Sequence, residues 1–178
     1  MPSGRLPVTF YRSTAQLPPF DDYRMTDRTY RYFKGDPLFA FGHGLSYTTF
    51  AYSNLTADHK EAVAADVIRV SVDVRNSGKR DGHEVVQLYV RPLNGPADRP
   101  VKDLRGFQRI FLKAGETRRI TFDLRADRDM LRYSDEKKGL APALGTYEIQ
   151  VGASSKDIRA VRSVRILPEA ARVVETAR

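Results

Sequence analysis

The sequence predicts an all-β fold, an antiparallel sandwich preceded by a segment with little regular structure. From residue 67 onward, apolar and polar residues alternate in short runs, as they do in half-buried strands. Turn residues separate these runs. Helical patterns do not alternate with the strands, which argues against a parallel sheet. With 41% apolar residues among 178, the chain can bury a core and does not have the composition of a disordered protein.

The clearest strand is predicted at 67–75, where every second residue from Ile68 to Val74 is apolar. The turn residues Asn76-Ser77-Gly78 end it. In the strand at 85–91, Val86, Leu88 and Val90 are expected to share one buried face. The remaining strands are predicted at 45–52 with 54–57, 104–112, 118–124, 130–133 (a short edge strand), 145–152 and 161–166. Seven or eight strands at this spacing are typical of an immunoglobulin or fibronectin type III-like sandwich. A frayed helix is predicted at 169–178.

Residues 1–40 hold few regular elements. A short strand is predicted at 6–11, and Pro18-Pro19 stops its continuation. Of nine tyrosines and nine phenylalanines, twelve lie between Phe10 and Tyr52. A segment so aromatic and so poor in periodicity cannot form its own core. It must lie against another surface, and if exposed it would be an interaction patch.

The stretch from Phe41 to Phe50 separates the two parts of the chain. Gly42 and Gly44 allow the backbone to bend sharply. The residues from Leu45 onward are aromatic and β-branched, which suits a first strand. We therefore predict three parts: residues 1–40, which end a preceding domain and lead out of it; residues 41–167, the sandwich; and residues 168–178, a C-terminal tail.

The charge pattern argues against two classes of partner. The chain has 30 Lys and Arg against 22 Asp and Glu, a net charge of +8, but a nucleic-acid-binding surface needs its charge in a patch. No nucleic-acid partner is therefore expected. No membrane partner is expected either, because no apolar run approaches the ~18 residues that cross a bilayer. Cysteine is absent, which rules out disulfides. The strand arginines are spaced singly and are expected to face solvent: Arg69, Arg75, Arg91, Arg109, Arg119, Arg162 and Arg165.

No residue is predicted to be catalytic or to bind a metal or cofactor. Asp21 and Asp22 are adjacent carboxylates, but neighbouring side chains point apart in an extended chain, so we expect a solvated loop. His43, His59 and His83 lie in different segments without a cluster of ligands. The sequence contains no nucleophile elbow, phosphate-binding loop or dinucleotide fingerprint.

Three stretches together resemble one known family. They are Ser3–Phe10 (SGRLPVTF); Arg28–Phe33 (RTYRYF), which continues through Pro37-Leu38-Phe39 into Gly42–Phe50 (GHGLSYTTF); and the sandwich motifs. The last are Asn76-Ser77-Gly78, Gly82–Val90 (GHEVVQLYV) and Leu104–Phe107 (LRGF) through Gly115-Glu116-Thr117. Over residues 2–167 the sequence is similar to the C-terminal end of glycoside hydrolase family 3 enzymes of the β-glucosidase and β-xylosidase type. Arg28–Phe33 is most similar to the branch that contains the xylosidases.

The resemblance implies a fibronectin type III-like domain at 41–167. Residues 1–40 would then be the last strand and exit segment of the family's α/β sandwich domain. Retaining hydrolysis needs two carboxylates about 5 Å apart, and in this family both lie upstream of the part that this chain matches. Met1 falls inside the first matching motif, so the chain is expected to be a fragment, a truncated reading frame or a wrongly assigned start.

The expected function is that of a non-catalytic accessory part of a family 3 β-glycosidase acting on β-glucosides or β-xylosides, inactive alone. The alternative is a stand-alone sandwich module that binds carbohydrate or protein. An upstream reading frame encoding the barrel and most of the α/β domain would decide for the first. Expected partners are those missing domains, β-linked saccharides, and a second copy bound through residues 1–40. The compartment is periplasmic or extracellular if the full enzyme carries a signal peptide.

Tyr30, Arg31, Tyr32 and Phe33 are the candidate substrate-adjacent residues. Aromatic faces with an interleaved cation can stack on sugar rings beside a cleft. They can equally hold the exit segment against neighbouring domains. The second interpretation is favoured, because nothing else in this segment supplies a core.

Overall fold

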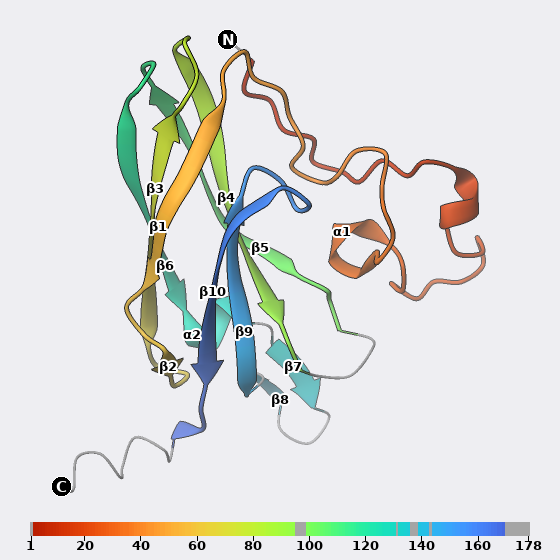
Figure 1. Cartoon of the computed structure of the whole chain (residues 1–178). Coiled ribbons are helices and arrows are strands. Elements are labelled where there is room, and N and C mark those ends of the chain that lie inside the picture. The colour runs from red at the N-terminus through yellow and green to blue at the C-terminus, as the bar shows by residue number, and fades with distance from the viewer. Residues whose placement is uncertain (1, 95–98, 131, 136–138, 143, 170–178) are drawn as a thin grey trace, which may run out of the picture.

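The computed structural model describes residues 2–94, 99–130, 132–135, 139–142 and 144–169. Two sheets face one another, and the N-terminal segment, here residues 2–45, extends from one side of them (Figure 1). The first sheet has the strand order β1-β3-β6 and the second β2-β10-β9-β4-β5. The predicted all-β sandwich is confirmed.

The strands follow the predicted alternation closely. All pair antiparallel except the short β2, which lies parallel to β10. A separate hairpin, β7-β8, lies beside the sandwich. The bounds are β1 Phe50–Ala57, β2 Glu61–Ala62, β3 Val67–Asn76, β4 Gly82–Pro92, β5 Asp103–Leu112, β6 Thr117–Arg125, β7 Arg132–Asp135, β8 Gly139–Pro142, β9 Gly145–Gly152 and β10 Ile158–Ile166.

Helical structure is confined to single turns in the described part of the chain. A 3-10 turn spans Thr14–Gln16, α1 spans Thr29–Tyr32 and α2 spans Ala126–Asp129. In these described ranges, no helix is long and apolar enough to cross a membrane.

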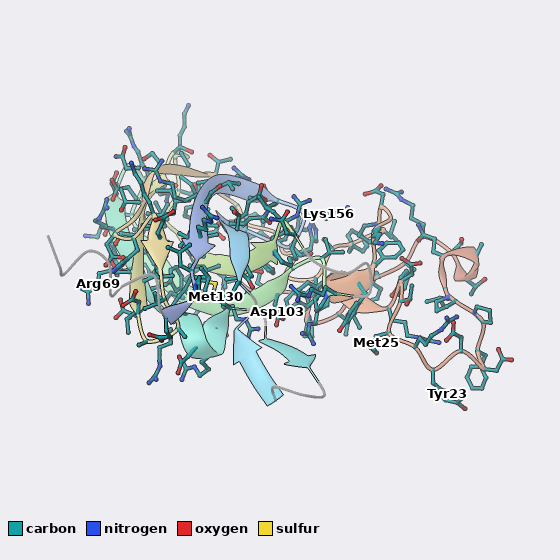
Figure 2. All side chains as sticks on the ribbon, turned by 90° about the horizontal axis from the view of Figure 1, so that it is seen from below. Tyr23, Met25, Arg69, Asp103, Met130 and Lys156 are labelled. Atoms are coloured by element: carbon teal, nitrogen blue, oxygen red, sulfur yellow. The ribbon has the colours of Figure 1, made fainter. Side chains whose placement is uncertain are left out.

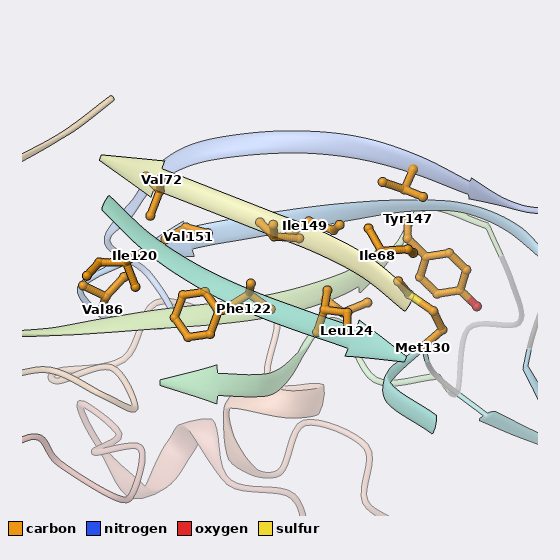
Figure 3. Packing of buried hydrophobic residues seen from close by; sticks show 14 of the residues in the cluster. Ile68, Val72, Val86, Ile120, Phe122, Leu124, Met130, Tyr147, Ile149 and Val151 are labelled. Atoms are coloured by element: carbon orange, nitrogen blue, oxygen red, sulfur yellow. The ribbon is translucent and has the colours of Figure 1, made fainter. Parts of the chain in front are cut away.

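The core lies between the sheets (Figure 3). Val72 on β3 pairs with Ile120 on β6 in one sheet, and Leu88 on β4 pairs with Val151 on β9 in the other. All four are buried in one cluster, whose members all come from residue 50 onward. Each such side chain contributes roughly 1.5–3 kcal/mol when buried. The sandwich therefore has a core that takes no residue from the N-terminal segment.

Asn76 does more than end a strand. Its side chain is fully buried, and its Oδ1 accepts hydrogen bonds from the Thr48 hydroxyl at 2.7 Å and the Gly78 N–H at 3.1 Å. Its Nδ2 donates to the carbonyl oxygens of Arg80 at 2.7 Å and Leu112 at 3.1 Å. A buried amide is tolerated when its donors and acceptor are satisfied. Asn76 thus joins the entry to β1, the β3–β4 turn and the end of β5.

The predicted opening strand at 45–52 is wrong in its first half. Strand β1 begins at Phe50, and Leu45 and Tyr47 are 73% and 70% exposed. Tyr47 and Thr48 instead form a bend, in which Thr48 bonds Asn76. The strand at 6–11 is also wrong, because only an isolated bridge between Phe10 and Phe39 forms there.

The edge strand predicted at 130–133 lies later, as β7. Met130 is instead fully buried in the core cluster, so the period-two reading there mistook a core contact for a strand. The frayed helix predicted at 169–178 falls almost wholly outside the described residues.

Candidate functional site: the junction of segment and sandwich

Strand β4 is buried on both faces, which its alternation did not predict. Val86, Leu88 and Val90 face the core, so Val85, Gln87 and Tyr89 face outward. Nevertheless these three are buried too, and Tyr89 is 0% exposed. The N-terminal segment contacts two of them: Tyr30 lies against Tyr89, and Gly42 lies against Gln87.

Tyr30 is the centre of this contact. Its ring stacks on Phe41, with centroids 4.1 Å apart, and meets Tyr89 edge-on at 6.0 Å. Its hydroxyl oxygen accepts the Leu104 N–H at 3.0 Å and donates to the Asp103 carboxylate at 3.3 Å. Burial raises the pKa of Tyr30 above its ordinary value, and the hydrogen bond from Leu104 opposes this. Tyr30 therefore joins the segment to the start of β5.

Arg31 binds the same carboxylate. Its Nε lies 3.1 Å from Asp103 Oδ1 and its Nη2 donates to Oδ2 at 3.2 Å, while Arg105 approaches Oδ2 at 2.8 Å. The guanidinium carbon lies 5.7 Å from the Tyr32 ring centroid. Asp103 thus lies between two cations at the junction, where Figure 2 labels it.

Phe33 packs within the segment itself. It is buried, with its ring edge-on to Tyr11 at 4.9 Å between centroids. Of the four predicted residues, Tyr30 and Arg31 hold the segment on the sandwich, Phe33 packs inside the segment, and Tyr32 is half-buried against Arg31. Contact with a substrate stays a prediction.

Gly42 lies in the glycine stretch that was expected to bend sharply, and it also approaches the sandwich closely. Its φ is +79°, in the left-handed region, and a Cβ there would overlap Gln87 Oε1. Gln87 Nε2 donates to the carbonyl oxygens of Gly42 at 3.1 Å and Ala153 at 2.7 Å, and Gln87 Oε1 accepts the Tyr89 hydroxyl at 2.5 Å. Only glycine combines this φ with this contact at low cost.

Arg5 and Glu84 form a buried ion pair at the other end of the junction. The Nη2–Oε1 distance is 2.5 Å, and the two side chains are 12% and 5% exposed. Burial raises the pKa of Glu84, while the charge and hydrogen bond of Arg5 and the Val85 N–H lower it. The sequence suggested neither residue, because a single arginine and a strand glutamate read as solvent-facing.

A basic cleft opens between the segment and the sandwich. Its volume is about 230 Å³. Four of the ten lining residues are cations and none is acidic. The segment contributes Thr9, Tyr30, Phe33, Lys34 and Pro37, and the sandwich contributes Arg91, Val101, Lys102, Ser155 and Lys156.

The histidines and the paired aspartates do not gather into one site, and the ring of His43 lies 5.2 Å from that of Phe39. His59 bonds Asp58 at 2.7 Å, and His83 lies 5.1 Å from the Phe111 ring. Asp22 pairs with Arg24, whose hydrogen bonds lower the pKa of this carboxyl to about 2. Across the described ranges, no three His, Asp or Glu residues gather in a way that could hold a metal ion.

The comparisons with known proteins agree on one family. The fibronectin type III-like domain model matches residues 84–155. The chain is 45% identical over 157 residues to a xylan 1,4-beta-xylosidase of Xylanibacter ruminicola, covering 88% of this chain and 18% of that protein. It is 40% identical over 178 residues to the thermostable beta-glucosidase B of Acetivibrio thermocellus, covering 93% of this chain and 23% of that protein.

A solved structure gives the same answer. The GH3 beta-glucosidase of Bifidobacterium adolescentis superposes with a TM-score of 0.78 at 35% identity, covering 93% of this chain and 26% of that one. The chain thus spans about a fifth of the length of the curated relatives it matches, and the match falls at their C-terminal end. It belongs to glycoside hydrolase family 3, as the C-terminal part that contains the fibronectin type III-like domain.

Proposed function

We propose that this chain is the non-catalytic C-terminal accessory part of a family 3 β-glycosidase that hydrolyses β-glucosides or β-xylosides. The observation that carries the proposal is the junction itself. An aromatic segment is fixed onto the sandwich beside β4 by Tyr30, Arg31 and Gly42. The sandwich would then hold the end of that domain in place.

The buried carboxylates support an absence of catalysis by this chain alone. Glu84 pairs with Arg5, Asp103 with Arg31 and Arg105, and Asp129 with Arg128. A retaining glycosidase needs two carboxylates about 5–5.5 Å apart, one as nucleophile and one able to exchange protons. These three are each committed to arginines.

The exposed apolar surface of the segment supports a partner domain. An apolar groove of about 470 Å³ is lined by Leu6, Phe10, Phe39 and Leu45 among others. Farther along, Phe20 and Tyr23 are 95% and 89% exposed, and Figure 2 labels Tyr23 at the end remote from the sandwich. Apolar surface of this kind marks an interaction site. Since the relatives are about five times longer, we assign it to the preceding domain of the same enzyme.

Two measurements test the proposal. The purified chain should show no turnover of aryl β-glucosides or β-xylosides, and turnover abolished by mutating a residue of this chain would contradict it. Alone, the chain should self-associate through the exposed face of residues 1–40, as seen by size-exclusion with light scattering. A chain with Phe20→Ser and Tyr23→Ser should associate less. Monomeric behaviour of the unmutated chain would argue against that face as a docking surface.

A further inference from the structure

The basic cleft defined above concentrates positive charge without an internal counter-ion. Its lining contains Lys34, Arg91, Lys102 and Lys156 and no carboxylate. Glu148, the acid whose charge acts on Lys102, approaches Arg91 Nη1 at 3.3 Å and accepts from Gln150 Nε2 at 2.7 Å. Asp103 lies beside the lining residue Tyr30 but pairs with Arg31 and Arg105. The four lining cations therefore outweigh the carboxylates near them, and the net positive charge favours an anionic ligand.

Lys102 is held in a fixed position at this cleft. Its Nζ donates to Gln150 Oε1 and to the Ser155 carbonyl oxygen, both at 2.8 Å, and lies 5.7 Å from the Tyr89 ring centroid. A lysine ammonium has three donors, and among the described residues these two are its hydrogen-bond acceptors. One N–H is therefore left for a ligand. Burial, together with the charges of Arg91 and Lys156, lowers the pKa of Lys102 to about 8. Both effects disfavour the charged ammonium, since no carboxylate lies directly against it.

Lys156 adds a second, uncommitted ammonium. Its backbone N–H bonds Ser154 Oγ at 3.3 Å, while its Nζ has no hydrogen bond or ion pair with the described residues. Figure 2 labels Lys156 at the junction between the segment and the sandwich. Two lysines from different positions along the chain thus converge on one cleft, which suits a carboxylate with two oxygens.

The size and lining of the cleft limit which anionic ligands can bind. A space of about 230 Å³ is many times the roughly 10–15 Å³ that one water needs, which leaves room for one sugar ring. Tyr30, Phe33 and Val101 add apolar side chains to its lining. We propose that this cleft binds a single carboxylated sugar unit, a hexuronate, with its carboxylate on Lys102 and Lys156. The negative charge of the ligand is inferred from the lining cations alone. The choice of a sugar ring rests on the proposed function.

Titration of the full chain tests this. Sodium glucuronate, glucose and acetate are each added at low ionic strength, with binding followed by calorimetry and by amide NMR shifts. We expect glucuronate to bind at least about tenfold more tightly than glucose or acetate, with shifts centred on Lys102 and Ser155. Lys102→Met and Lys156→Met should each weaken it about tenfold, as loss of a charge-assisted hydrogen bond would. Lys113→Met, an exposed lysine on the β5–β6 turn, is the matched control and should bind normally.

Several outcomes would overturn the proposal. Equal affinity for acetate and glucuronate would make the cleft a plain anion site, and equal weakening by Lys113→Met would make the attraction diffuse. Absence of glucuronate binding would reject the site and leave the accessory role untouched, because that role is tested by turnover. If Lys102→Met does not fold, Lys156→Met decides, since its ammonium holds no described partner.

Discussion

Arg5 and Glu84 meet 79 positions apart in the sequence, with the guanidinium Nη2 of one 2.5 Å from the carboxylate Oε1 of the other, in a nearly solvent-free setting. Alternation along β4 places Glu84 on the core-facing side, with Val86. The segment thus supplies the counter-ion for a charge that the sandwich has buried.

Removal of Arg5 should strongly destabilise the chain. Arg5→Ala leaves Glu84 buried and unpaired, a change that typically costs about 3–5 kcal/mol. Urea unfolding measures it. The control is Arg12→Ala, which breaks an exposed pair with Asp36 and should cost less than about 1 kcal/mol. In the double variant Arg5→Ala, Glu84→Gln the loss should be less than the sum of the single losses. Additive losses would mean that the two groups are not coupled.

Two glycines with nearly the same φ should respond differently to alanine. Gly115 has φ +81° with open space around its Cβ position, whereas Gly42 has φ +79° and faces Gln87. Gly115→Ala should therefore cost only the left-handed strain, roughly 1–2 kcal/mol. Gly42→Ala should cost about 1–3 kcal/mol more, measured by urea unfolding. Equal losses would show that Gln87 moves aside freely.

A chain that begins at Gly42 should still unfold in one cooperative transition, because the core cluster takes no residue before Phe50. It should nevertheless be less stable than the full chain, since Tyr89 becomes exposed and its burial is worth roughly 1.5–3 kcal/mol. Glu84 also loses Arg5. Thermal melts of the two chains compare them. Loss of any cooperative transition would place the domain boundary earlier than the glycine stretch.

Alkaline titration should reveal Lys102. Its pKa of about 8 in the folded chain is below the unfolded value near 10.4. Between these values the unfolded state therefore binds more protons, and the free energy of unfolding rises with pH. Unfolding measured from pH 8 to 9.5 should show this rise, and the Lys102→Met variant should show less of it. An identical pH dependence in the two would mean that Lys102 titrates normally. The buried tyrosines, whose pKa is raised in the folded chain, oppose this rise as the pH nears 10, and they do so equally in both chains.

The strands were predictable because buried and solvent-exposed residues alternate along them. Val67–Asn76 and Thr117–Arg125 are strands of this kind, and both were located within two residues. In strand β4 the same alternation misleads. It predicts that Gln87 and Tyr89 face solvent, whereas residues more than forty positions away in the sequence cover them. Periodicity reports which residues share a face, and it does not report what covers that face.

The junction was predictable only in outline. An aromatic segment without periodicity had to lie against something, and Tyr30 does lie against the sandwich. The polar partners, Asp103 and Lys102, carried no local signal, because a charged residue in a loop or at a strand end is usually solvated. Their roles depend on tertiary approach alone.

The double-sided burial of β4 has a consequence for anyone who wishes to graft this sandwich onto another protein. Truncation at the glycine stretch would leave a domain with an exposed apolar surface on the outer face of β4. Tyr89 would need a polar replacement such as threonine, and Glu84 would need a neutral substitute, before the domain could be used in a new host. A host protein with its own aromatic segment covering this face would need none of these changes.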